Sequence, residues 1–155
     1  TILISWFLID ESDHLNIRWQ KINLYAFDRT KYRVGTKKAC ETLWRRDWFN
    51  IVSIHRWTEY EKKPNFVQQE LAETLTECGA DVIVWSHPHT NQPTRKITVW
   101  KRSSITAFSL WNFIFDQPPK GLKASGWWIL VYGNKKIFTG MVVEHPLRDL
   151  VKWWK

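Results

Sequence analysis

The chain has 155 residues with a formal net charge of +8, and 44% of its residues are hydrophobic and 25% charged, as in one ordinary globular domain. No apolar run approaches the roughly 20 residues that a membrane helix needs, and no signal peptide is visible. The chain begins at Thr1 inside an apolar, strand-like run. We therefore expect a fragment whose upstream part, with any export signal, is missing.

Hydrophobic periodicity predicts alternating strands and helices in the first half of the chain. The segment 21–27 alternates like a strand, 35–46 is typical of a helix, and 50–55 is typical of a buried strand that ends on His55. A loop that contains Glu59 follows.

A capping signature predicts where the second helix begins. Asn65 is followed three residues later by Gln68, which is the spacing of a capping box, and Gly79 suits the position after the last helical residue. The next buried strand is 81–85. Residues 50–85 thus predict a strand–helix–strand unit with parallel strands and a right-handed connection.

The second half of the chain is expected to be a β-rich layer. Four segments are typical of strands: 96–100, 104–110, 128–132 and 135–145. The sequence YGNKK between the last two indicates a hairpin. No internal repeat or linker is visible, so residues 1–155 are expected to form a single α/β domain.

Cys40 and Cys78 fall on predicted helices and form no C-x-x-C motif, so we expect two buried free thiols and no disulfide. The basic residues occur as scattered pairs, which is typical of solvated surfaces but also compatible with an anionic partner such as phosphate, a polyacid or nucleic acid. These pairs are Lys37-Lys38, Arg45-Arg46, Lys62-Lys63, Arg95-Lys96, Lys101-Arg102 and Lys135-Lys136.

Three histidines follow the ends of predicted strands. His55 ends one strand, and His87 and His89 follow the next in the sequence DVIVWSHPHTNQP (81–93). Parallel strands place their carboxyl ends at one edge of a sheet, where the sites of open α/β folds gather. Imidazole is a common ligand of transition metals, so a metal site is expected here, although loop histidines without a metal show the same pattern.

Two stretches resemble the CapA family of capsule and poly-γ-glutamate synthesis, a family of the calcineurin-like metallophosphoesterase superfamily. They are IVSIHRWTEYEKKPNFVQQELAETLTECGADVIVWSHPHTNQP (51–93) and ITAFSLWNFIFDQ (105–117). The family blocks run roughly V-S-x-H-W-G-x-E-Y, G-A-D-x-V-x-G-x-H-P-H and S-L-G-N-F-x-F-D-Q. The resemblance implies that this chain is the C-terminal half of an α-β-β-α sandwich.

The resemblance also implies a catalytic site with a divalent metal pair (Mn, Fe or Zn). His55, His87 and His89 match its histidine ligands, whereas Glu59, Asn112 and Asp116 match positions that support the ligands or anchor loops; Asn112 is equally compatible with a plain turn residue. Such a site clamps a phosphate and activates water. The implied substrate is phosphate-containing or polyanionic, and the implied location is the cell envelope or another extracytoplasmic compartment.

Two motif blocks of the family, G-D and N-N-H, do not occur in this chain, and they supply the remaining ligands. We therefore expect the isolated chain to have little activity even if the complete protein is an enzyme. Two other functions fit the sequence less well: a basic, Trp-rich module that binds polyanions or nucleic acid without a metal, and an inactive partner domain in polymer assembly. The metal-site hypothesis expects no nucleic acid, and metal content separates it from the metal-free module.

Tryptophan stands at three positions where the family pattern has glycine: Trp57, Trp85 and Trp111. The chain holds 12 Trp and only 6 Gly, whereas about 7% Gly, roughly eleven residues, is typical. One hypothesis explains both: the gene uses UGA for glycine, as some bacteria do, and was translated with UGA as Trp. Because glycine there would permit positive φ or close approach, we expect an indole at position 85 to crowd the metal edge.

Overall fold

The computed structural model describes residues 11–17, 20–28, 36–43, 48–55, 58–110, 125–132 and 139–146. They form a six-stranded sheet in the order β1-β2-β3-β4-β6-β5, two helices and a separate two-stranded sheet. The strands of the large sheet are β1 Glu11–Ile17, β2 Gln20–Asp28, β3 Phe49–His55, β4 Val82–Ser86, β5 Asn91–Val99 and β6 Arg102–Leu110. The α/β fold class predicted from the sequence is confirmed.

The centre of the large sheet is parallel. Strand β3 pairs in parallel with β2 on one side and with β4 on the other, and β4 pairs in parallel with β6. The outer strands β1 and β5 are antiparallel to their neighbours. The predicted strand–helix–strand unit is therefore confirmed, with its two strands adjacent in the sheet.

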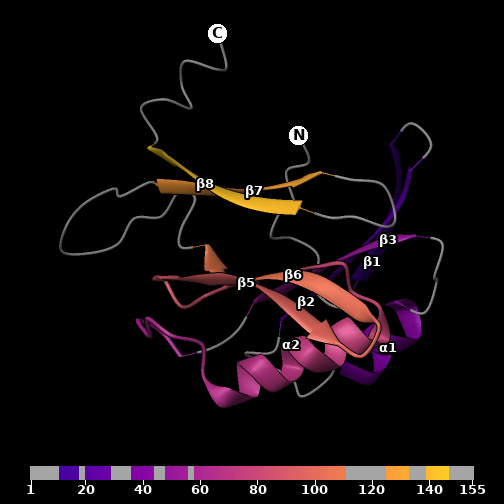
Figure 1. Ribbon diagram of the computed structural model, residues 1–155, viewed down its shortest axis with the longest axis horizontal. Helices are drawn as coiled ribbons and strands as arrows, with labels where there is room; N and C mark the ends of the chain where they lie inside the picture. Colours follow the sequence, from indigo (N-terminus) through magenta and orange to yellow (C-terminus); the bar gives the residue numbers. More distant parts are fainter. Residues whose placement is uncertain are drawn as a thin grey trace, which may run out of the picture.

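The helices and the small sheet lie on opposite sides of the large sheet (Figure 1). Helix α1 (Thr36–Leu43) and helix α2 (Phe66–Cys78) pack against one face. Strands β7 (Ser125–Tyr132) and β8 (Thr139–Pro146) pair antiparallel with each other across the other face. This antiparallel pair confirms the predicted hairpin partners, while the turn at 133–138 and the N-terminal apolar run lie outside the described residues.

The main hydrophobic core lies between the sheet and the helices. Because side chains alternate across a strand, one face of the central strands carries apolar residues toward helix α2. Residues of the core cluster are Tyr25, Leu43, Val52, Ile54, Leu71, Ala72, Leu75, Ala80, Ile83, Trp85 and Phe108. His55, next to Ile54 in β3, therefore belongs to the opposite face of the sheet.

Helix α2 has the predicted start and stop. The Asn65 side chain accepts a hydrogen bond from the Gln68 backbone N–H, and the Gln68 side chain accepts one from the Asn65 backbone N–H, which completes the capping box. Gly79 ends the helix with φ of 113°, a left-handed angle that glycine adopts without strain.

No helix in the described part of the chain is long and apolar enough to cross a membrane.

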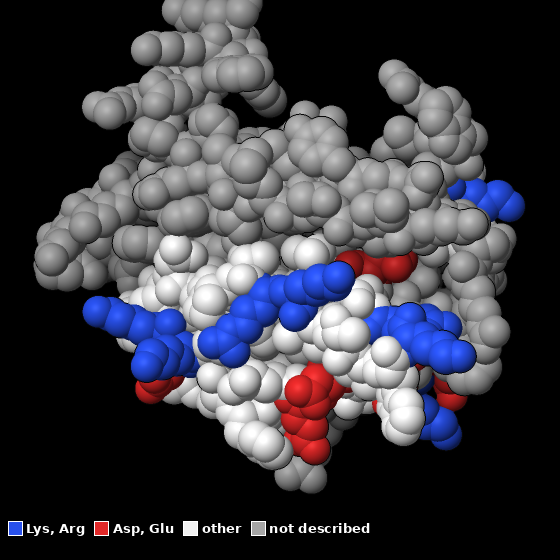
Figure 2. All heavy atoms as spheres, viewed as in Figure 1, with Lys and Arg blue, Asp and Glu red and all other residues white. Residues whose placement is uncertain are grey.

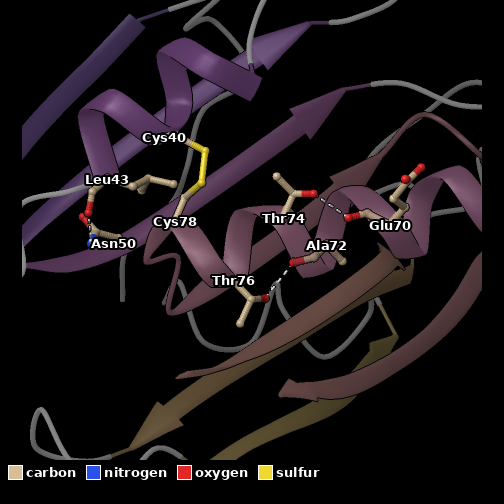
Figure 3. Close-up of a disulfide and its surroundings, with 8 residues drawn as sticks. All are labelled: Cys40, Leu43, Asn50, Glu70, Ala72, Thr74, Thr76 and Cys78. Atoms are coloured by element: carbon tan, nitrogen blue, oxygen red, sulfur yellow. Dashed lines mark hydrogen bonds between the residues drawn. A yellow bond between two sulfur atoms is a disulfide. The ribbon is translucent and has the colours of Figure 1, made fainter. Parts of the chain in front are cut away.

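The expectation of two free thiols is wrong. Cys40 in α1 and Cys78 at the end of α2 form a disulfide across 38 residues of sequence (Figure 3). The cause is tertiary: the two helices pack side by side, which brings the Cα atoms to 5.0 Å, within the range that a disulfide requires. The spacing of two cysteines in a sequence contains no information about that approach.

Candidate functional site

The ends of β3 and β4 bring the histidines together. His55, the last residue of β3, is in register with Ser86, the last residue of β4. His87 and His89 follow β4 directly. The predicted placement of the three histidines at the carboxyl edge of adjacent parallel strands is confirmed.

Ring contacts show that the three side chains face the same space. The ring centroids of His55 and His87 lie 4.8 Å apart, edge to face. Those of His87 and His89 lie 5.7 Å apart. The Nδ1 atom of His55 lies 3.3 Å from the Ser86 hydroxyl oxygen, which is a hydrogen bond between the ends of β3 and β4. All three histidines are half-buried, so they are both positioned and accessible.

Glu59 was expected to support the ligands, but its carboxylate lies close enough to His87 and His89 to be a candidate ligand itself. Ligand atoms of Glu59, His87 and His89 all lie within 4.8 Å of one another. The Glu59 carboxylate is 3.9 Å from His87 Nε2. His55 is not part of this tight group and adjoins it through the His87 ring.

The donor set of this group suits a divalent transition metal. Two imidazoles and one carboxylate form a recurrent ligand set of catalytic zinc and of non-haem iron, with positions open for water or substrate. Ligand bonds of about 2.0–2.2 Å place two ligands of one ion at most about 4.4 Å apart, when they lie on opposite sides of the ion. The Glu59–His87 separation of 3.9 Å lies below this limit, whereas ligand atoms as far apart as 4.8 Å would have to move closer to share one ion.

The backbone of the H-x-H loop is held in an unusual conformation. His87 and His89 have φ angles of 98° and 51°, in the left-handed region that non-glycine residues rarely adopt. Tyr60 in the facing loop also has a positive φ, 65°, and its N–H donates to the Pro88 carbonyl at 2.7 Å. Such angles persist only where surrounding contacts fix them, and they cluster at functional sites.

Trp85 does not crowd this edge, so that expectation is wrong. The residue is in register with Ile54 and lies on the helix side of the sheet, where it is 0% exposed and stacks on Phe108 with ring centroids 5.5 Å apart. The positive φ angles fall at His87 and His89 and not at Trp85. Among the described residues, the indole Nε1 of Trp85 has no hydrogen-bond acceptor.

Four of the residues singled out from the sequence lie outside the described part of the chain: Trp57, Trp111, Asn112 and Asp116. Their roles therefore stay predictions. The structure adds Tyr60, whose ring centroid is 6.3 Å from that of His89. Tyr60 directly follows Glu59 in the loop after β3, and this position could have pointed to it from the sequence.

On the face seen in Figure 2, the Lys and Arg side chains of the described residues lie across the middle of the molecule. Acidic and neutral side chains lie among them. Trp100, in the turn between β5 and β6, is 89% exposed and has Lys101 as its neighbour.

The architecture and the strand-end cluster define an α/β protein with a candidate metal site. Its sequence matches the family described as "Bacterial capsule synthesis protein PGA_cap" over residues 10–117, which include every described member of the cluster. The chain belongs to this family.

Two curated proteins are similar to parts of this chain. One is "PGA biosynthesis protein CapA" of Bacillus subtilis (strain 168), with 40% identity over 97 residues, which are 63% of this chain and 24% of that protein. Another is "Capsule biosynthesis protein CapA" of Bacillus anthracis, with 42% identity over 67 residues, which are 43% of this chain and 15% of that protein. The matched segments thus span a quarter or less of these relatives.

A solved structure shares the fold. A hypothetical protein from Thermus thermophilus superposes with a TM-score of 0.58, over 87% of this chain and 62% of that chain. The two sequences are 12% identical. This similarity supports the α/β architecture and carries no information about activity.

Proposed function

We propose that this chain supplies part of a two-metal hydrolytic site in a CapA-type protein of capsule or poly-γ-glutamate synthesis. The observation that carries the proposal is the group of Glu59, His87 and His89, whose ligand atoms lie within 4.8 Å of one another beside His55. The names of the two Bacillus relatives support the biosynthetic role. The resemblance to metallophosphoesterases supports the chemistry.

The residues have separate tasks in this proposal. One ion would be held by the imidazoles of His87 and His89 and the carboxylate of Glu59. His55 would bind the second ion, or it would hold a proton next to that ion. When bound, the metal pair supplies Lewis-acid polarisation of a phosphoryl oxygen and an activated water. Ser86 orients His55 through its hydroxyl, and the left-handed backbone at His87 turns that ring toward the loop that carries Glu59.

The substrate class follows from this chemistry. A divalent pair binds anionic oxygens, so we propose a phosphate-containing or polyanionic substrate. The ligands of the G-D and N-N-H blocks, which the family resemblance implies, would complete both ions in the complete protein. The proposal requires no nucleic acid.

The disulfide supports a location outside the cytoplasm. Stable disulfides form in oxidising compartments and are rare where thiol buffers keep cysteines reduced. The pair Cys40–Cys78 links two helices of the main core. We propose the cell envelope or the extracellular side as the place where this domain works.

Metal binding by variants of the complete protein tests the proposal. Exchanging His87 for Ala or Glu59 for Gln should lower the affinity for Mn²⁺ or Zn²⁺ in calorimetric titration, because each change removes a ligand. A matched control is Glu73→Gln, which removes an exposed carboxylate from helix α2, away from the site. Unchanged affinity in the His87 and Glu59 variants would contradict the proposal.

Metal titration, together with assays of polyanion binding and of turnover, separates the alternatives. A protein that binds no metal but retains single-stranded DNA or a polyanion would support the Trp-rich binding module. A protein that binds metal through these residues but turns over no phosphodiester when complete would support an inactive partner domain in polymer assembly.

A further inference from the structure

A chain of buried amide side chains connects the start of helix α2 with the loop that carries Glu59. Gln68 is 0% exposed and Gln92 is 3% exposed. The Gln68 Nε2 atom donates to the Gln92 Oε1 atom at 3.4 Å, and the Gln92 Nε2 atom donates to the backbone carbonyl of Glu61 at 2.8 Å. Two buried amides thus join the loop at Glu61 and the nearby start of helix α2 to Gln92 in strand β5, which lies 31 and 24 residues away in the sequence.

The groups at the two ends of this series of hydrogen bonds fix which amide atoms donate and which accept. The backbone N–H of Asn65 can only donate, and it donates to Gln68 Oε1 at 3.1 Å. The carbonyl of Glu61 can only accept. Gln68 must therefore present its Nε2 to Gln92, and Gln92 must present its Nε2 to Glu61. The two amides have one satisfied orientation, since reversing either would leave buried polar groups facing like groups.

Further bonds fasten the same loop to the H-x-H segment. The Thr90 hydroxyl donates to the Glu61 carbonyl at 2.6 Å, so this carbonyl accepts two hydrogen bonds. The Tyr60 N–H donates to the Pro88 carbonyl at 2.7 Å. Each of these attachments is one or two residues from Glu59, whose carboxylate lies 3.9 Å from His87.

We infer that Gln92 and Gln68 are positioning residues that hold the Glu59 carboxylate at the distance from His87 and His89 needed to share a metal ion. This inference rests on the proposed metal site. Gln92 acts through the Glu61 carbonyl, and Gln68 acts by orienting the Gln92 amide. Groups that orient metal ligands change metal affinity by about 10- to 100-fold when they are lost.

The test uses Gln92→Met in the complete protein, with Gln69→Met as the matched control. Gln69 contacts the Pro64 and Asn65 carbonyls at the same helix start but makes no hydrogen bond to Gln92 or Glu61. Mn²⁺ titration should show affinity lowered about 10- to 100-fold by Gln92→Met and nearly unchanged by Gln69→Met. In a Glu59→Gln background, Gln92→Met should change affinity by less than roughly twofold, because the positioned group is already gone.

A second readout needs no metal. Hydrogen exchange of the Tyr60 amide should accelerate at least about tenfold in Gln92→Met, while exchange of the Leu75 amide in helix α2 stays as in the parent, because only the loop attachment is lost. Gln92→Asn, which keeps an amide but shortens it, gives a smaller change and serves if the Met variant fails to fold.

The outcomes separate the two claims. If the parent protein binds no Mn²⁺, the proposed function fails and the metal-positioning role of Gln92 fails with it, while Tyr60 exchange still decides whether Gln92 holds the loop that carries Glu59. Equal loss of affinity in the parent and Glu59→Gln backgrounds would show that Gln92 acts generally on the fold, which overturns the inference. Unchanged Tyr60 exchange in Gln92→Met would overturn it as well.

Discussion

Replacing Trp85 with glycine should destabilise the domain, because the indole fills the core between the sheet and helix α2. The side chain is 0% exposed and stacks on Phe108 at 5.5 Å between ring centroids. Truncating a buried Trp costs about 3–5 kcal/mol, and glycine within a strand adds about 0.5–1 kcal/mol.

An unsatisfied polar group on Trp85 itself reduces this loss of stability. The Nε1–H of Trp85 is buried and, within the described residues, has no acceptor, and such a group costs about 1–3 kcal/mol. The net expectation for Trp85→Gly is a loss of about 3 kcal/mol in unfolding free energy. Trp85→Phe keeps the stacked ring and removes the N–H, so it should stay within about 1 kcal/mol of the parent.

Urea unfolding followed by circular dichroism measures these differences without depending on Trp fluorescence. The two explanations of position 85 predict opposite changes in unfolding free energy for Trp85→Gly. If the residue is native packing, the Gly variant unfolds at lower urea. Equal or higher stability of the Gly variant would refute native packing and agree with a UGA codon translated as Trp. The codon gives a direct check, since UGG at 57, 85 and 111 would end the recoding hypothesis.

Three further predictions concern activity and stability. The isolated chain should show little metal-dependent phosphodiesterase turnover, because about half of the ligands of a two-metal site are expected elsewhere; strong turnover with Mn²⁺ that disappears in His87→Ala would contradict this. Changing Cys40 and Cys78 together to Ser should lower the free energy of unfolding by about 4 kcal/mol in the chain-entropy relation for the 38-residue separation, and equal urea midpoints with and without the bond would refute it. Gly79→Ala should cost more than about 1 kcal/mol, because φ is 113°, a left-handed angle that side-chain-bearing residues rarely adopt, and a Cβ atom would also lie 3.1 Å from the Leu43 carbonyl oxygen; an unchanged melting temperature would be the contrary result.

The strand–helix–strand unit could be predicted because each local signal agreed with the others. The apolar run before His55, the capping box at Asn65 and the glycine at position 79 mark the unit's boundaries, and parallel pairing then places His55 beside His87. Strand β1 was not predicted, since its sequence ESDHLNI is mostly polar and its pairing with β2 is what forms it.

Other features depend on tertiary contacts that no local pattern encodes. The direction of Trp85 depends on which face of β4 is turned to the helices, and a shift of one residue reverses that face. The disulfide depends on the packing of α1 against α2. The approach of Glu59 depends on Gln92 and Thr90 fastening its loop, a connection across about thirty residues of sequence.

Anomalous diffraction at the zinc edge from crystals of the complete protein grown with Zn²⁺ tests the central claim most directly. We predict a peak bonded at about 2.0–2.2 Å to the imidazoles of His87 and His89 and to the Glu59 carboxylate. A zinc peak located away from these three residues, or no peak at this strand edge, would contradict it.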